Sequence, residues 1–160
     1  MQNHIYKIDE SRFDELKRRM FVYGLKRLGV PFILPIILEY YVLRKQDFPI
    51  IPFVIIMLIV MAGVFYVGYS RSLKAAKTFV VQIDDNSIEA KAEMAPYKKI
   101  YWTNMIVNQK TDGSIQLFDN NVSSFMRKMY GNGLITIPPE IENRDELLLE
   151  ISSKSSTVLK

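Results

Sequence analysis

The chain has 160 residues and a mass of 18.6 kDa, the usual size of one domain and too small for a multi-domain enzyme. It has no cysteine and one histidine, His4, which excludes disulfides, thiolate zinc sites, cysteine nucleophiles and sites that need two imidazoles. The net charge is +4, yet between Leu28 and Tyr69 only four residues are charged. Composition therefore predicts an apolar block within an otherwise polar chain.

The first 27 residues are predicted to form a short strand and an amphipathic helix. Residues 5–8 have strand composition, and Ser11 followed by Asp14 is typical of a helix N-cap with an acidic third residue. Apolar residues then recur at helical spacing, at Phe13, Leu16, Met20 and Tyr23. Two alternatives stay open for this stripe: it lies on a membrane surface, or it docks against the C-terminal part of the chain.

The first apolar run extends from Leu28 to Leu43 and contains two prolines and one carboxylate, Glu39. At about 1.5 Å per residue it spans roughly 24 Å as a helix, which is short for a bilayer unless the preceding turn extends it. It is therefore either a membrane span or a tilted or re-entrant segment. Glu39 is interpreted as an acid at the membrane interface, with a coupling or ion-pathway carboxylate as the alternative.

The second apolar run, from Phe48 to Tyr69, has 22 residues and no charged, hydroxyl or amide side chain apart from tyrosine. As a helix it spans roughly 33 Å and is apolar on every face, which matches a hydrocarbon core of about 30 Å. The alternative, a buried central helix, would require the rest of a small domain to enclose it completely. We therefore predict a transmembrane helix, paired with the first run through residues 44–47.

Positive charge lies on the two outer sides of this hairpin, and only two basic residues lie in the connection. The positive-inside rule then predicts two spans with both termini in the cytoplasm. The residues expected at the membrane interface are Lys17, Arg18, Arg19, Lys26, Arg27, Arg71, Lys74 and Lys77.

From residue 78 the pattern changes to the alternation of β-strands. Strands are predicted at residues 79–83, 87–94, 97–102, 105–110, 114–119 and 134–137. In the second of these strands Ser87, Glu89, Lys91 and Glu93 are expected to face water. A final helix is expected to begin at Asn143, with Glu146 three residues on, and to bury Leu147, Leu148 and Ile151.

The sequence thus predicts an α+β membrane protein with a two-helix transmembrane hairpin and a small antiparallel β-barrel closed by a C-terminal helix. The expected segments are residues 1–27 as a strand and amphipathic helix, 28–69 as the hairpin, 70–77 as a basic linker, 78–154 as the β domain and 155–160 as a tail.

Two stretches are candidates for binding a partner because they mix basic and aromatic side chains. They contain Lys98 and Lys99, and then Phe125, Arg127, Lys128 and Tyr130. The second stretch is either an interaction loop for a membrane surface, a protein or nucleic acid, or a half-turn of helix that packs Phe125 and Met129 on the barrel. Nucleic acid is disfavoured because residues 111–160 hold five basic and seven acidic residues.

Other short patterns are interpreted as structural. Gly131 to Gly133 is expected to form a turn, because neither the lysine nor the helix of a phosphate-binding loop follows it. The carboxylates Asp84, Asp85, Glu140 and Glu142 are expected at a turn and at a helix entry, and no metal site is expected.

Three local motifs carry a family resemblance: YWTNMI at residues 101–106, SIQLF at residues 114–118 and LITIP at residues 134–138. With the hairpin and the C-terminal helix, the chain resembles the bacterial pleckstrin-homology-like (PH-like) membrane proteins of the YcxB-like kind over nearly its whole length. The family often has a basic residue after the last of these motifs, where this chain has Pro139. The resemblance implies a PH-like barrel in a membrane-tethered binding or scaffold module, with no catalytic residue to transfer.

We therefore expect a non-enzymatic protein of the bacterial cytoplasmic (inner) membrane, without cofactor, whose PH-like domain binds a protein, a peptide or lipid headgroups. An accessory or immunity-type subunit that recognises another membrane protein or a toxic peptide is the alternative, with Glu39 and the prolines shaping an intramembrane groove. A lipid-acting enzyme is a third reading, disfavoured for want of a nucleophile and base. The lipid bilayer is an expected partner, nucleic acid is not, and homo-oligomerisation stays open.

Overall fold

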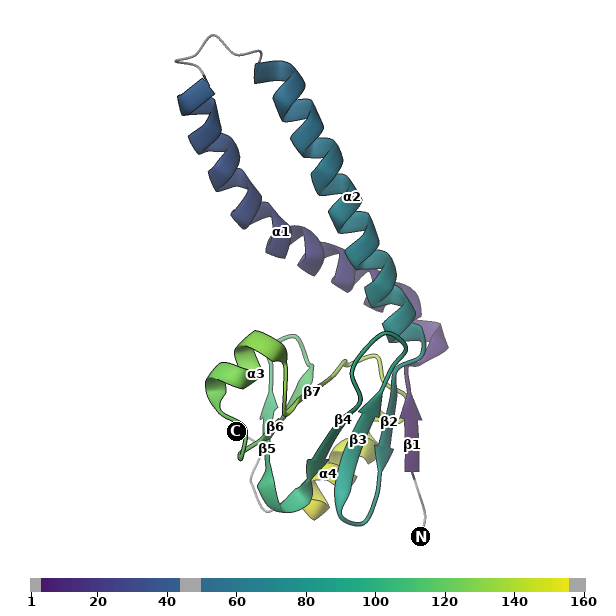
Figure 1. The fold of residues 1–160 in the computed structure, drawn as a ribbon. Helices are drawn as coiled ribbons and strands as arrows, with labels where there is room; N and C mark the ends of the chain where they lie inside the picture. Colours follow the sequence, from purple (N-terminus) through teal and green to yellow (C-terminus); the bar gives the residue numbers. More distant parts are fainter. Residues whose placement is uncertain (1–3, 44–49, 156–160) are drawn as a thin grey trace. The chain divides into compact units, whose positions relative to one another are not determined.

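The computed structural model of the protein describes residues 4–43 and 50–155, with residues 28–36, 38–43, 50 and 53 described by their backbone alone. The chain divides into two compact units (Figure 1). The hairpin unit is Asp14–Leu73, and the β-unit combines Met1–Phe13 with Lys74–Lys160. The hairpin unit is therefore an insertion into the β-unit.

Two long helices form the hairpin unit, α1 (Phe13–Leu43) and α2 (Ile50–Lys77). The predicted amphipathic helix and the first apolar run are one continuous helix, and the predicted connection at residues 44–47 lies outside the described residues. A short 3-10 helix (Glu10–Arg12) precedes α1, and Asp9 caps it by accepting hydrogen bonds from Ser11 N and Oγ at 2.9 and 2.6 Å. The predicted cap at Ser11 is therefore wrong, because Asp9 supplies the acceptor.

In the described part of the chain, one helix is long and apolar enough to cross a membrane, by length and composition. It is Val54–Lys77, which has 24 residues and a mean hydropathy of 1.9. No residue of its most apolar 18-residue stretch is buried inside the protein. The prediction of a transmembrane helix is therefore confirmed in its coarser form, as a helix long and apolar enough to span a membrane. No second helix of this kind is found among the described residues, and the side chain of Glu39 lies outside them.

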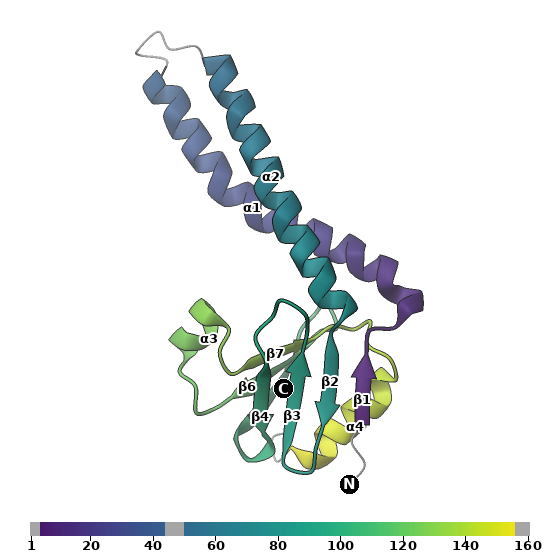
Figure 2. The same cartoon turned by 45° about the vertical axis from the view of Figure 1, so that its right-hand side comes forward.

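The β-unit contains two antiparallel sheets with the strand orders β1-β2-β3-β4 and β5-β6-β7 (Figures 1 and 2). The first sheet comprises β1 (His4–Lys7), β2 (Val80–Ile83), β3 (Ser87–Lys91) and β4 (Lys98–Tyr101). The second comprises β5 (Met105–Gln109), β6 (Ile115–Asp119) and β7 (Leu134–Ile137). The 3-10 helix Trp102–Asn104 joins the two sheets.

The predicted closed barrel is corrected to two sheets, since no closed barrel is found over the described strands. On one side the sheets are joined by the chain between β4 and β5. On the other side the end of β1 meets the segment after β7 through a single bridge between Ile8 and Ile141, flanked by Asp9 N to Glu140 O and Glu142 N to Lys7 O, both at 2.8 Å.

Strand β1 pairs with β2 although the whole hairpin unit lies between them in the sequence. The register is antiparallel, with His4 opposite Ile83 and Lys7 opposite Val80. The N-terminal strand, grouped with residues 1–27 from the sequence, is thus the edge strand of the first sheet.

One hydrophobic core lies between the two sheets and helix α4 (Arg144–Lys154). Its fully buried members include Val81, Ile83, Ile88, Ile100, Leu117, Ile135, Ile137, Leu147 and Ile151, each 0% exposed. Burying each of these side chains stabilises the β-unit by about 1.5–3 kcal/mol before entropy is counted. Helix α4 therefore closes the core, as the sequence predicts, although Asn143 has a left-handed backbone (φ 47°) and makes no side-chain cap bond.

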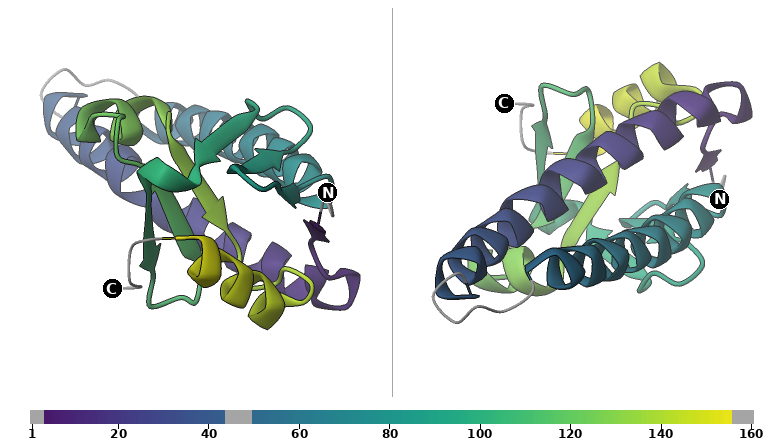
Figure 3. Two further views of the ribbon diagram at one scale, coloured as in Figure 1. Left: turned by 90° about the horizontal axis from the view of Figure 1, so that it is seen from below. Right: turned by 90° about the horizontal axis from the view of Figure 1, so that it is seen from above.

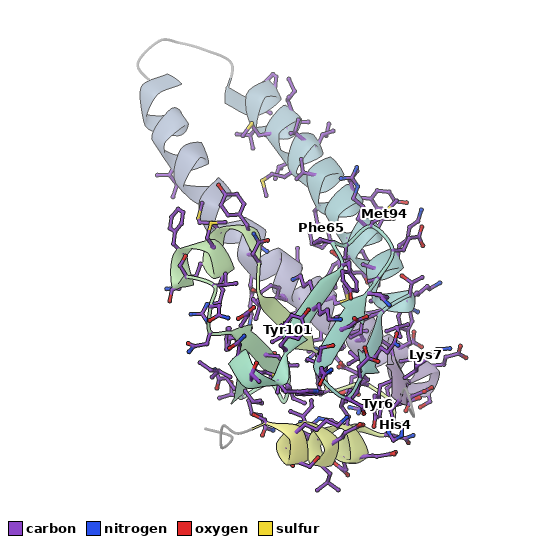
Figure 4. All side chains as sticks on the ribbon, turned by 60° about the horizontal axis from the view of Figure 1, so that its bottom comes forward. His4, Tyr6, Lys7, Phe65, Met94 and Tyr101 are labelled. Carbon is purple, nitrogen blue, oxygen red and sulfur yellow. The ribbon has the colours of Figure 1, made fainter. Side chains whose placement is uncertain are left out.

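Polar contacts fix the C-terminal half of α4 to the first sheet. Glu150 accepts hydrogen bonds from the Tyr6 hydroxyl at 2.9 Å and lies 3.2 Å from His4 Nδ1, and Figure 4 shows both labelled residues beside this helix. Burial, aided by Glu150, raises the pKa of Tyr6. One turn further along the helix, Lys154 Nζ lies 5.6 Å from the centre of the Trp102 ring and 3.2 Å from Asp84 O. Helix α4 is thus held by β1 and by the turn after β2.

Candidate functional site

The first candidate surface is the short helix α3 (Ser124–Tyr130), which lies at the opposite end of the β-unit from α4 (Figures 1 and 3). The Ser123 hydroxyl caps its start by accepting from Met126 N at 3.3 Å. Gly131 ends it in a left-handed conformation (φ 67°), where its N–H donates to Arg127 O at 3.0 Å. The sequence thus specifies both ends of this helix locally.

The large apolar side chains of α3 face away from the core of the β-unit. Phe125, Met126, Met129 and Tyr130 are 66%, 38%, 63% and 65% exposed. They occupy positions i, i+1, i+4 and i+5, which share one face of a helix. The alternative in which Phe125 and Met129 pack on the barrel is therefore wrong, and we name this surface the α3 face.

Arg127 lies on the side of α3 that faces the sheet. Its guanidinium lies 5.3 Å from the centre of the Phe118 ring on β6, and its Nη2 donates to Ser124 Oγ at 3.3 Å. A cation over an aromatic face is stabilising, so this contact helps to hold α3 against β6 with its apolar face outward.

Lys98 lies beside the C-terminal end of α3. Its Nζ donates to Leu134 O at 2.7 Å and lies 3.6 Å from where a Cβ would stand at Gly131. Burial lowers the pKa of this ammonium group. The structure thus brings Lys98 together with Phe125, Arg127, Lys128 and Tyr130, five of the six predicted partner-binding residues.

Lys99, the sixth, belongs to a different cluster on the outer face of the first sheet, because neighbours along a strand point to opposite faces. Lys99 Nζ lies 2.9 Å from Glu89 Oε1, and Lys91 Nζ lies 3.2 Å from Glu89 Oε2. Glu89 is only 7% exposed, so the prediction that its strand has one fully wet face is wrong at Glu89 and at Ser87 (1% exposed). Hydrogen bonds from Tyr97 and Lys99 lower the pKa of Glu89 to about 2.

The remaining predicted site residues lie on the two long helices. Lys17, Arg18, Arg19, Lys26 and Arg27 are on α1, whereas Arg71, Lys74 and Lys77 are on α2. Lys17 pairs with Asp14, and Lys77 Nζ lies 5.8 Å from the centre of the Phe13 ring. Their contact with a membrane surface stays a prediction, as does the role of Glu39.

Aromatic packing joins α1 to α2 within the hairpin unit. Phe21 meets Phe65 and Tyr69 edge-on, with ring centres 5.2 and 5.7 Å apart, and Phe65, labelled in Figure 4, stacks on Tyr69 at 5.8 Å. Beside this cluster lies an open groove of about 320 Å³, lined by Gly24, Arg27, Val64, Phe65, Gly68 and Ser72 among others. A sequence-based search misses this groove because its lining residues come from two helices that are distant in sequence.

Within the described residues, no group of three or more His, Asp or Glu side chains could hold a metal ion. The one histidine lies against Glu150 at the edge of the first sheet. Residues Gly131 to Gly133 form a turn after α3, as predicted, with Gly133 O accepting from Asp119 N at 2.8 Å. The arrangement therefore offers exposed apolar and basic surface for binding.

Comparison with protein-family models, with curated proteins and with solved structures gives no match for this chain.

Proposed function

We propose that the protein is a membrane-anchored, non-enzymatic binding or scaffold module. The hairpin unit anchors it in the bacterial cytoplasmic membrane, and the β-unit presents the α3 face to a protein, a peptide or lipid headgroups on the cytoplasmic side. The observation that carries the proposal is the contrast between α2, whose most apolar window is 0% buried, and the closed core of the β-unit. A tethered module needs only weak contacts, because tethering raises the effective concentration of its target.

The pairing of β1 with β2 supports two spans rather than one. These strands lie directly before α1 and directly after α2. Strands that share a sheet lie on the same side of a membrane, so a chain whose α2 crosses the bilayer must also cross it within α1 or the connection. The excess of basic residues at the outer ends of the hairpin supports a cytoplasmic location for the β-unit.

The PH-like resemblance remains part of this proposal. Two packed antiparallel sheets and a C-terminal helix that fills the core support it. The single bridge between Ile8 and Ile141 replaces a full strand pairing where a barrel would close.

The absence of cysteine allows a direct test of the topology. Single-cysteine variants Gln46→Cys, between the helices, and Ser152→Cys, on α4, would be labelled in intact cells with a membrane-impermeant maleimide. We expect Gln46→Cys to react from outside and Ser152→Cys to react only after lysis. Equal labelling of both variants in intact cells, or release of the protein by alkaline carbonate, would overturn the proposal.

An accessory subunit of a membrane protein complex is the second candidate, and the groove between α1 and α2 favours it. A Cβ at Gly68 would meet no atom within 4 Å, so a partner helix has room to approach there. Gly68→Leu fills this groove, whereas Gly63→Leu, at an equally open position outside it, is the matched control. A membrane protein that co-purifies in native nanodiscs with the control and not with Gly68→Leu would establish this candidate.

A further inference from the structure

We propose that the α3 face inserts into the surface of an anionic phospholipid bilayer. This inference rests on the proposed function and deepens it, because it names the target of the β-unit as the membrane that holds the hairpin unit. The four exposed side chains of α3 would lie among headgroups and upper acyl chains, and Lys128 would lie beside lipid phosphates.

The orientation of α3 is the first argument. A surface helix of a soluble domain normally buries its apolar stripe and exposes its charged side. Here Arg127 contacts Phe118 and Ser124 on the inward side, while Phe125, Met129 and Tyr130 are each more than 60% exposed. This arrangement is the one adopted by a helix that meets an apolar medium on its outer side.

Charge complementarity favours an anionic surface. Residues 120–139 contain Arg127 and Lys128 and no acidic residue. Lys98 adds a third positive charge next to the C-terminal end of the helix. Basic residues near an anionic membrane are attracted by its negative surface potential.

The size of the patch distinguishes a bilayer from a protein partner. A stable protein interface involves about 20–30 residues on each side, whereas the α3 face offers four large side chains. A few inserted side chains suffice for a domain that is already tethered, since insertion is then an intramolecular step. Tyr is also enriched at membrane interfaces, and Phe is typical of the apolar face of helices that lie in the interface.

The covalent connections keep the β-unit close to the hairpin. Residues 8–12 join β1 to α1, and residues 78–79 join α2 to β2. At about 3.5 Å per residue, connections of five and two residues reach less than about 20 Å. The bilayer is therefore within reach of the β-unit in every copy of the protein.

The experiment uses the full chain, in which an introduced cysteine is the only one. Met129→Cys on α3 and Leu149→Cys on α4 (63% and 71% exposed) each carry a nitroxide label and are reconstituted into vesicles. The vesicles contain phosphatidylcholine alone or with an equal part of phosphatidylglycerol. The measured quantity is the ratio of the label's collision rate with oxygen to its collision rate with a water-soluble nickel chelate. For the label at 129, we expect this ratio to be severalfold higher in vesicles with phosphatidylglycerol than in vesicles of phosphatidylcholine alone. The label at 149 should not change.

Charge is tested by Lys128→Glu in the Met129→Cys background, with Lys110→Glu, at the turn before β6, as the matched control. Lys128→Glu should reverse most of the rise in oxygen collisions, and Lys110→Glu should leave it unchanged. A label at 129 that stays water-accessible in both vesicle types would overturn the inference. So would immobilisation of that label only in native membranes, which would indicate a protein partner.

Failure of this inference differs from failure of the proposed function. If the protein resists carbonate extraction from the vesicles while the label at 129 stays in water, the membrane anchor is supported and only the insertion of the α3 face is refuted. Protein that does not enter the vesicles at all loses the proposed function. Unchanged circular dichroism and Trp102 fluorescence show that each variant is folded.

Discussion

The two units of this chain treat the same kinds of side chain in opposite ways. In the β-unit Ile83, Ile88 and Leu147 are 0% exposed, whereas in the hairpin unit Ile51 and Ile59 are 74% and 66% exposed. In water, each exposed side chain of this size forgoes about 1.5–3 kcal/mol of burial free energy. This contrast is the one expected if the β-unit faces water and, as proposed, the hairpin unit faces lipid.

Helix α3 does not follow the rule of its own unit. It belongs to the β-unit, yet its large apolar side chains are exposed like those of α2. Within the β-unit, α3 therefore gathers four exposed large apolar side chains on one short helix.

The largest expected effect tests whether α2 lies in a lipid bilayer. Replacing both Ile55 and Ile59 with arginine should disfavour membrane insertion by about 5–7 kcal/mol, while the core of the β-unit, which contains neither residue, is unaffected. Alkaline carbonate should then release the protein from membranes. The control is the double leucine variant, which should stay membrane-bound; retention of the arginine variant would refute the contrast between the units.

The second prediction tests the buried core of the β-unit. Leu117→Ala on β6 should destabilise the β-unit by about 2–5 kcal/mol, because Leu117 is fully buried. Membrane integration should not change. Urea unfolding followed by Trp102 fluorescence measures the loss, and Leu149→Ala, at a 71% exposed position, is the control that should shift the midpoint little.

Substitution of glycines by alanine gives the third prediction, with smaller expected changes in the stability of the β-unit. Gly133 has φ 62°, and a Cβ there would lie 2.6 Å from Val122 Cγ2, so Gly133→Ala should destabilise the β-unit by about 2–3 kcal/mol. Gly131→Ala has a similar φ of 67° and no close contact, so it should cost about 1 kcal/mol. Equal urea midpoints for the two variants would show that the contact with Val122 relaxes freely. Gly63→Ala in α2 should leave the midpoint unchanged.

The smallest expected effect depends on pH. The folded-state pKa of Glu89 is about 2 against a usual value of 4.5, so its stabilising effect is complete above pH 4.5 and is lost as pH falls towards 2. At pH 3 the wild type should have lost about 1–2 kcal/mol relative to pH 7. Glu89→Gln should lack this loss, and the difference between the two urea curves at each pH measures it. If the wild type and Glu89→Gln lose the same unfolding free energy as the pH falls, Lys91 and Lys99 do not stabilise the carboxylate.

Much of the fold follows from local patterns. The predicted strand at residues 134–137 coincides with β7, and alternation also located β2, β5 and β6 to within a residue or two. These strands each have one side in the core, so burial leaves a period of two in the sequence. The helix that buries Leu147 and Ile151 was predictable for the same reason.

The missed features all depend on partners distant in sequence. Glu89 was expected in water because no local pattern shows that Lys99 and Tyr97 cover it. The outward orientation of Phe125 accompanies a contact between Arg127 and Phe118 on β6, which the sequence of an isolated helix does not encode. The partner of β1 was likewise not predictable, since strand composition does not specify which strand it joins.

The insertion of the hairpin between β1 and β2 also orders the events of synthesis. The ribosome releases β1 first, and its partner appears only after both long helices have been made. The edge strand therefore has no partner until both long helices have been made. Under the proposed topology, the sheet can form only when both ends of the hairpin are on the same side of the membrane, so pairing of β1 with β2 would report that insertion has ended in that topology.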